Sequence, residues 1–134
     1  MLQLEVVTPY RQVLLTEVES VIIPSTEGYL GIMKNHAPLV AGLKIGVVHY
    51  GPAGGDKELL AVSGGFVEVS DNKVTILADT AELSGEIDVL RAEEARRRAE
   101  QRLRAREANI DFTRAELALQ RALSRLQAAG KHRR

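Results

Sequence analysis

The chain changes character at Ser84-Gly85, and this change constrains its fold more than any other feature of the sequence. Before it, short apolar runs alternate with polar residues and are broken by Gly and Pro; after it there is no Pro and Gly occurs only at Gly130. Residues 1–85 carry 5 Lys/Arg and 10 Asp/Glu, a net charge of −5, whereas residues 86–134 carry 13 and 8, a net charge of +5. We therefore expect two domains with separate roles, 1–85 and 86–134.

The first 85 residues predict a β domain. Short runs rich in Val, Ile and Leu and bounded by turn residues are typical of strands, and they occur at 2–7, 12–15, 18–23, 47–50, 57–62, 66–69 and 73–77. Ser70-Asp71-Asn72 suits a tight hairpin turn between the last two. Strands at this spacing, without helices between them, predict an antiparallel sandwich or barrel whose strand order and register the sequence leaves open.

The last 50 residues predict two helices. Asp88 is placed to cap a helix that runs to about Arg106, and Asn109-Ile110-Asp111 interrupts the helical pattern. Asp111 can cap a second helix that runs to about residue 129 and ends at Gly130. Two helices joined by a short connection form an antiparallel hairpin.

The faces that would close this hairpin are narrow and rich in Ala. The second helix offers a seam at spacings of 3 and 4, and the first helix a matching stripe. Their members are Phe112, Ala115, Leu119, Ala122 and Leu126, facing Ala92, Ala95, Ala99 and Leu103. Because Ala buries little apolar area, at about 25 cal/mol per Å², we expect a hairpin that opens at a cost of a few kcal/mol, as a switch requires.

Four arginines fall on two helix faces. Arg91 and Arg98 are seven residues apart on the first helix, and Arg121 and Arg125 are four apart on the second. In a closed hairpin their guanidinium groups could converge, and guanidinium groups bind phosphate oxygens in bidentate fashion. The alternative is an ordinary solvated face.

Several other kinds of chemistry are excluded or weakly indicated. The absence of Cys excludes disulfides and thiolate chemistry, and we find no metal-ligand spacing or paired carboxylates. Residues 51–57 faintly resemble a phosphate loop but lack its Gly-Lys-Ser/Thr ending. His36 has no Ser, Cys or second His nearby, so it suits a local hydrogen bond or a partner contact. With no signal peptide at Met1–Glu5 and no apolar run of about 20 residues, we expect a soluble protein that reaches membranes only through a partner.

Three stretches, in order, carry a resemblance to a known family. They are 27–33 running into 36–39, 63–69 followed by 74–79, and 87–92 at the start of the first helix. Over essentially its full length the chain resembles the epsilon subunit of F-type ATP synthase.

This resemblance implies an α+β fold: an N-terminal antiparallel β-sandwich of about ten strands followed by a C-terminal two-helix hairpin. It implies a non-catalytic rotor subunit that binds the gamma subunit and the c-ring, peripheral at the cytoplasmic face of the plasma membrane. The loop 27–37 would belong to that contact, through Glu27, Tyr29, Leu30 and His36. When extended, the hairpin would meet the alpha/beta catalytic hexamer and inhibit hydrolysis.

The resemblance also implies ATP as a regulatory ligand of the hairpin. The pattern Ile/Leu-Asp-x-x-Arg-Ala marks members that bind ATP without hydrolysing it, and residues 87–92 fit it completely. Ile87 and Ala92 would pack on the base or sugar, and Asp88 and Glu82 would accept hydrogen bonds from adenine N6 or the ribose. The phosphates would be held by Arg91, Arg98, Arg121 and Arg125. Whether magnesium takes part stays open.

Two alternatives belong to other functional classes. The Arg-rich helices and the tail 131–134 would also suit a nucleic-acid-binding protein, but aromatic residues for base stacking are nearly absent. Acidic residues also lie among the arginines, namely Glu93, Glu94, Glu100, Glu107 and Glu116. The second alternative is a small nucleotide-processing enzyme, which release of ADP from ATP would reveal.

Overall fold

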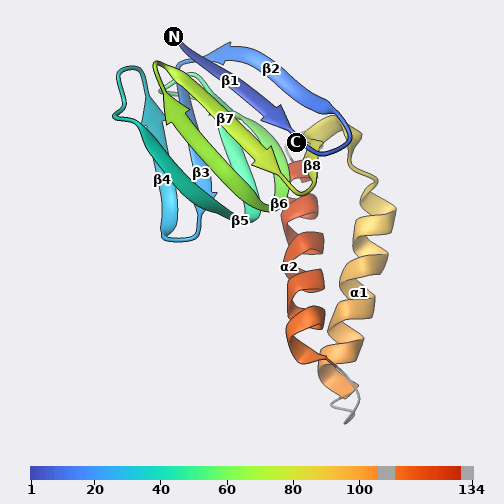
Figure 1. Ribbon diagram of the computed structural model, residues 1–134. Helices are drawn as coiled ribbons and strands as arrows, with labels where there is room; N and C mark the ends of the chain where they lie inside the picture. Colours follow the sequence, from blue (N-terminus) through green and yellow to red (C-terminus); the bar gives the residue numbers. More distant parts are fainter. Residues whose placement is uncertain (106–110, 131–134) are drawn as a thin grey trace.

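A computed structural model describes residues 1–105 and 111–130. Eight strands are followed by a short 3-10 helix and two α-helices. Their bounds are β1 Leu2–Val7, β2 Gln12–Val18, β3 Ser20–Ser25, β4 Gly28–Met33, β5 Leu39–Gly51, β6 Glu58–Ser70, β7 Lys73–Ala78, β8 Ala81–Leu83, η1 Ser84–Glu86, α1 Val89–Ala105 and α2 Phe112–Ala129. Figure 1 shows a sandwich of strands with the helical hairpin along one side, α2 next to the sandwich and α1 outside it.

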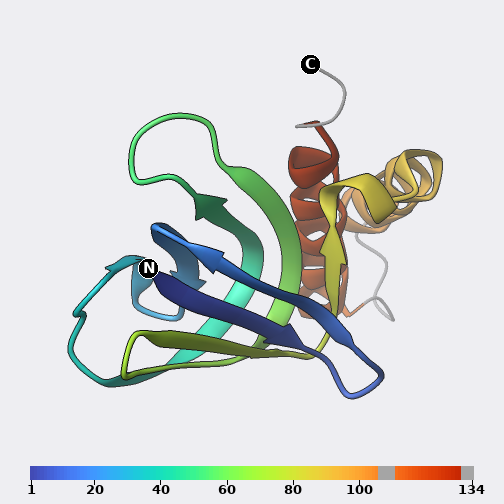
Figure 2. The same ribbon diagram turned by 90° about the horizontal axis from the view of Figure 1, so that it is seen from above.

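The strands form one sheet that folds over on itself into two layers (Figure 2). Its order is β2-β1-β7-β6-β5-β3-β4, and β8 pairs with β6. All pairs are antiparallel except β1 with β7. The central pair, β5 and β6, has 13 residues in each strand and takes part in both layers. β6 pairs with β8 through Leu60–Val62 and with β7 through Gly65–Ser70, so it changes partner at Gly64-Gly65.

The main core lies between the two layers and follows the period-2 pattern of the strands. On β1 the side chains of Leu2, Leu4 and Val6 are fully buried, whereas the intervening residues are not. Opposite strands contribute in the same way, and the largest fully buried side chains include Ile23, Ile32, Leu60 and Ile76. This alternation is the signal from which the sequence predicted the sandwich, and that fold class is confirmed.

The details of the sheet differ from the prediction. The described residues form eight strands, which roughly fits the expected ten. The β1–β7 pair is parallel, and the separate strands expected at 57–62 and 66–69 are one strand, β6. Most of the expected loop 27–37 is strand β4, which pairs with β3 along its whole length. Its two glycines weaken the strand signal in the sequence, and pairing with β3 supplies what local preference does not.

The turn and both helix starts agree with the sequence. Asp71 and Asn72 adopt left-handed φ angles of 50° and 59° in the β6–β7 hairpin, as a type I′ turn requires. The carboxylate of Asp88 accepts a hydrogen bond from the backbone N–H of Arg91 at 3.1 Å, and Asp111 caps α2 in the same way through Arg114 at 3.0 Å. The predicted interruption at Asn109-Ile110 lies outside the described residues. Gly130 follows α2 with helical rather than left-handed dihedrals.

The two helices meet along the predicted Ala-rich faces. Ala92 and Ala99 of α1 are buried against α2, as are Ala115 and Ala122 of α2 against α1. Leu103, Leu119 and Leu126 are half-buried. Phe112 was expected in the seam but is 44% exposed, and the first turn of α2 lies at the end of the hairpin that is far from the sandwich. The small Ala side chains therefore let the two helices approach closely, but the apolar contact between them is narrow.

A second apolar cluster docks the end of α2 on the sandwich. Ala128 and Ala129 pack against Val47 of β5 and Ala61 of β6. Ile87 joins them from the linker, residues 84–88, which connects β8 to α1. The hydroxyl of Ser84 donates a buried hydrogen bond of 2.7 Å to the carbonyl oxygen of Ala128. In the described part of the chain, no helix combines the length and hydropathy needed to cross a bilayer.

An ion pair fastens the linker to the β1–β2 turn. Arg11 Nη2 lies 2.9 Å from Glu86 Oε1, which also accepts a hydrogen bond from the backbone N–H of Leu83 at 3.0 Å. The bond from Arg11 is the main cause that lowers the pKa of Glu86 below its ordinary value; burial acts in the opposite direction, and the bond from Leu83 lowers the pKa further. The linker between the domains is thus held at a charged contact as well as at the apolar cluster.

Gly65 lies where β6 changes its pairing partner from β8 to β7, and a substitution there tests whether a residue without a Cβ atom is required. Its φ is 121°, and a Cβ atom there would lie 2.0 Å from the carbonyl oxygen of Leu77. We expect Gly65→Ala to lower the free energy of unfolding by roughly 3 kcal/mol or more, because strained φ and overpacking act together. The matched control is Gly54→Ala, where no atom lies within 4 Å and φ is not left-handed. Equal thermal midpoints for the two variants would contradict the role assigned to Gly65.

The linker ion pair predicts a pH effect. Because the folded-state pKa of Glu86 is lowered from 4.5, its contribution to stability is present above that pH and is lost as pH falls through the lower folded pKa. We expect Arg11→Gln to raise the pKa of Glu86 in an NMR titration and to weaken the loss of stability in acid. The pKa of Glu5, lowered by Gln12 and Lys73, serves as the control and should not move. An unchanged Glu86 titration in Arg11→Gln would contradict this assignment.

Candidate functional site

A cavity of about 320 Å³ lies where the hairpin meets the sandwich. Its volume is at the lower end of the range for small-molecule sites. Residues from β8, the start of α1 and the C-terminal half of α2 surround it. The lining residues are Glu82, Asp88, Arg91, Ala92, Ala95, Arg98 and Arg125.

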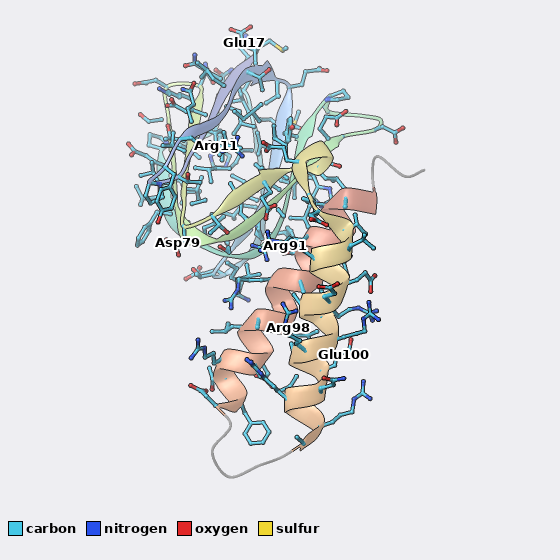
Figure 3. All side chains as sticks on the ribbon, turned by 90° about the vertical axis from the view of Figure 1, so that its right-hand side faces the viewer. Arg11, Glu17, Asp79, Arg91, Arg98 and Glu100 are labelled. Atoms are coloured by element: carbon cyan, nitrogen blue, oxygen red, sulfur yellow. The ribbon has the colours of Figure 1, made fainter. Side chains whose placement is uncertain are left out.

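One stripe of α1 supplies most of the lining. Positions 88, 91, 92, 95 and 98 recur at spacings of three or four and therefore share a helix face. Because the side chains of Ala92 and Ala95 are small, they leave space on this face between the longer side chains. Arg91 and Arg98 rise from the same side of α1 about two turns apart, and Figure 3 shows both on the side that faces α2. The helix thus presents two guanidinium groups with the small side chains of Ala92 and Ala95 between them.

Two of these arginines have no ion pair in the part of the chain that the structure describes. Arg96, on another face of α1, lies 2.6 Å from Glu93 and 3.2 Å from Glu100, and Arg104 also pairs with Glu100. By contrast, among the described residues the guanidinium groups of Arg91 and Arg98 have no ion pair or hydrogen bond. Arg91 and Arg98 thus line the cavity with guanidinium groups that are available for a ligand.

The two carboxylates at the cavity are both engaged. One Asp88 oxygen caps α1, and Glu82 Oε1 accepts a hydrogen bond from Arg125 Nε at 2.6 Å. With three guanidinium groups and two carboxylates, the lining has a net charge of +1. Within the described residues, no group of three or more His, Cys, Asp and Glu side chains is arranged to hold a metal ion. The arrangement suits an anionic ligand with several oxygens.

Six of the eight residues predicted for ATP binding line this cavity: Glu82, Asp88, Arg91, Ala92, Arg98 and Arg125. Arg121 instead lines a neighbouring shallow hollow that shares Glu82 and Arg125 with the cavity. Ile87 is 9% exposed and belongs to the apolar cluster that docks α2. Sequence reasoning missed Ala95 as a lining residue, although its spacing from Asp88, Ala92 and Arg98 could have shown it.

The residues predicted for partner contact lie away from the hairpin, on β4 and its flanking turns (Figure 1). Tyr29 is 62% exposed, Glu27 and His36 are exposed, and Leu30 packs partly against the core. His36 Nδ1 lies 2.7 Å from the carbonyl oxygen of Ala37, within its own turn. An exposed aromatic side chain on an edge strand is compatible with an interface, and the partner contact stays a prediction.

Two family models together match nearly the whole chain. A model described as the β-sandwich domain of the ATP synthase delta/epsilon chain matches residues 1–84. A model described as the long α-helix domain of the same chain matches residues 86–130.

Individual relatives and solved structures agree with this match. The ATP synthase epsilon chain of Symbiobacterium thermophilum is 57% identical over 130 residues, covering 96% of this chain and 93% of the relative. That of Moorella thermoacetica is 54% identical over 129 residues and covers 96% of each. A chain in the mitochondrial ATP synthase of Euglena gracilis, solved as OSCP/F1/c-ring, superposes with a TM-score of 0.78 at 27% identity, covering 96% of this chain and 80% of that one. The chain belongs to the ATP synthase delta/epsilon family.

Proposed function

We propose that this chain is the epsilon-type rotor subunit of an ATP synthase and that its hairpin binds ATP as a regulatory ligand. The subunit is non-catalytic. Its proposed partners in the central stalk are the gamma subunit and the c-ring, with the alpha/beta hexamer as a further partner when the hairpin extends. It would then lie peripherally at the cytoplasmic face of the membrane. The comparisons give no support to a nucleic-acid-binding protein or a nucleotide-processing enzyme.

The observation that carries the ATP proposal is the cavity with its two unpaired arginines. Arg91 and Arg98 line the cavity without an ion pair to any described carboxylate, and Arg125 lines the same cavity from α2. A triphosphate would supply the missing negative charge and would bridge the two helices, since its oxygens can accept from donors on both. Ala92 and Ala95 leave room for the nucleoside.

Binding without hydrolysis follows from the state of the carboxylates. A catalytic base must be within hydrogen-bond reach of the attacking water and able to take its proton. Asp88 is engaged in capping α1, and Glu82 is engaged by Arg125. ATP would therefore act as a ligand that stabilises one conformation.

Regulation then follows from linkage between ATP binding and closure of the hairpin. Ligand at 100 times its dissociation constant stabilises the binding conformation by about 2.7 kcal/mol. We expect a seam made mainly of Ala to hold the hairpin by only a few kcal/mol, so that ATP would decide between folded and extended states. In the extended state the basic helices would reach acidic segments of the catalytic hexamer and inhibit hydrolysis.

The arginine assignment is tested by Arg91→Ala. A hydrogen bond to a charged group contributes about 1.5–3 kcal/mol, so we expect ATP binding to weaken about 10- to 100-fold in calorimetric titration. The matched control is Arg97→Ala, since Arg97 is exposed on the same helix and does not line the cavity. Equal affinities of the two variants would remove Arg91 from the site.

The regulatory role is tested by removing residues 86–134. The main core lies between the sheet layers and includes no residue of α1 or α2, so we expect the β domain to remain folded and to bind gamma. ATP hydrolysis by the reassembled enzyme should rise because the inhibitory segment is gone. The full-length subunit, assembled in parallel, is the control, and equal inhibition by both forms would contradict the switch.

A further inference from the structure

The contact between Glu82 and Arg125 joins the sandwich to the hairpin at the rim of the cavity. Glu82 Oε1 accepts a 2.6 Å hydrogen bond from Arg125 Nε, across 43 residues of sequence. The two side chains are 33% and 31% exposed, so the contact is half-shielded from water. Both residues line the cavity, and the contact joins strand β8 to helix α2.

The geometry of this contact leaves most of the guanidinium group available. An arginine has five N–H donors, one on Nε and four on the two terminal nitrogens. Glu82 uses the Nε–H, and among the described residues the terminal nitrogens of Arg125 make no hydrogen bond. These terminal N–H groups form the fork that pairs with phosphate oxygens. Glu82 therefore holds the group from the side and leaves its end free.

Both partners are anchored in regular structure. Glu82 lies in β8, opposite Ala61 of β6. Arg125 lies in α2, three residues before Ala128, whose carbonyl oxygen accepts the hydrogen bond from Ser84. Residues 82 and 84 thus fix two successive turns of α2. A side chain held by such neighbours is oriented before the ligand arrives, which raises affinity by reducing the ordering that binding requires.

We propose that Glu82 is a positioning residue that orients Arg125 toward a phosphate group and couples phosphate binding to the docking of α2. This inference rests on the proposed function. It replaces the expectation that Glu82 accepts hydrogen bonds from adenine or ribose. Because the Nε–H of Arg125 continues to donate to Glu82 while the terminal nitrogens bind phosphate, bound ATP strengthens the link between α2 and the sandwich. ATP would in this way hold the hairpin to the sheet as well as holding its helices to each other.

The test is a double-mutant cycle on the full-length chain. ATP affinity is measured by calorimetry for the wild type, Glu82→Gln, Arg125→Ala and the double variant. We expect Glu82→Gln to weaken ATP binding about 10-fold alone and to have no further effect when Arg125 is already Ala. Glu86→Gln is the matched control, since it removes a neighbouring carboxylate that pairs with Arg11 outside the cavity. Circular dichroism of each variant verifies that it is folded.

Two readouts separate positioning from other roles. The ratio of ATP to GTP affinity should be the same in wild type and Glu82→Gln, because a positioning residue does not touch the base. The Arg125 Nε–H resonance should persist when ATP is added to wild type, because this N–H continues to donate its hydrogen bond to Glu82.

Several results would overturn the inference. Additive losses, a changed ATP to GTP ratio in Glu82→Gln or loss of the Nε–H resonance on ATP addition would show that Glu82 contacts the nucleotide or releases Arg125. Tighter ATP binding by Glu82→Gln would make Glu82 a competitor of phosphate. Failure of the wild type to bind ATP would refute the proposed function, and this inference with it.

Discussion

The docking of the last turns of α2 on β5 and β6 is the contact on which the hairpin depends. α1 packs mainly on α2, so its position relative to the sandwich is set through α2 and the linker. The contact surface consists of Ala128 and Ala129 against Val47, Ala61 and Ile87. Small side chains allow the helix to lie close to the sheet while burying little apolar area. Such a contact sets the position of α2 on the sheet but contributes little stabilisation to the docked state.

Charge opposes this closed arrangement in the absence of a ligand. Closing the hairpin brings Arg91, Arg98 and Arg125 to one cavity. Among residues 1–105 and 111–130, Arg125 pairs with Glu82, and no carboxylate pairs with Arg91 or Arg98. Like charges repel one another, although Arg91 and Arg98 are exposed and water weakens the effect, so the repulsion would offset part of the stabilisation from the apolar contacts. An anionic ligand removes this cost. Under the proposed function, the same arginines would weaken the closed form when the cavity is empty and would stabilise it when an anionic ligand is bound.

Sequence patterns predicted what depends on local order. Strict alternation located β1 and β7, and the caps at Asp88 and Asp111 located both helices. The length of β5 was underestimated, with a strand predicted only at 47–50, because glycines interrupt its apolar pattern. Gly46 is there because a Cβ atom would lie 2.9 Å from Cβ of Pro24, a contact between strands that local sequence does not reveal.

In the candidate site too, the sequence predicted the residues that share one helix, whereas contacts between separate elements required the structure. Asp88, Arg91, Ala92 and Arg98 share one helix face and were visible as spacing. The pairing of Glu82 with Arg125 and the placement of Ile87 in the docking cluster depend on how α2 meets the sheet. No periodicity within a segment carries that information, because the partners belong to separate elements. Family resemblance named the residues, and the three-dimensional arrangement separates those that line the cavity from those that support it.

The central claim is that ATP stabilises the closed hairpin, and hydrogen exchange of the full-length chain with and without ATP tests it most directly. At ATP 100 times above its dissociation constant, the account predicts about 100-fold slower exchange of backbone amides in α1 and α2, with exchange in the sandwich core unchanged. Identical exchange in the helices with and without saturating ATP would contradict it.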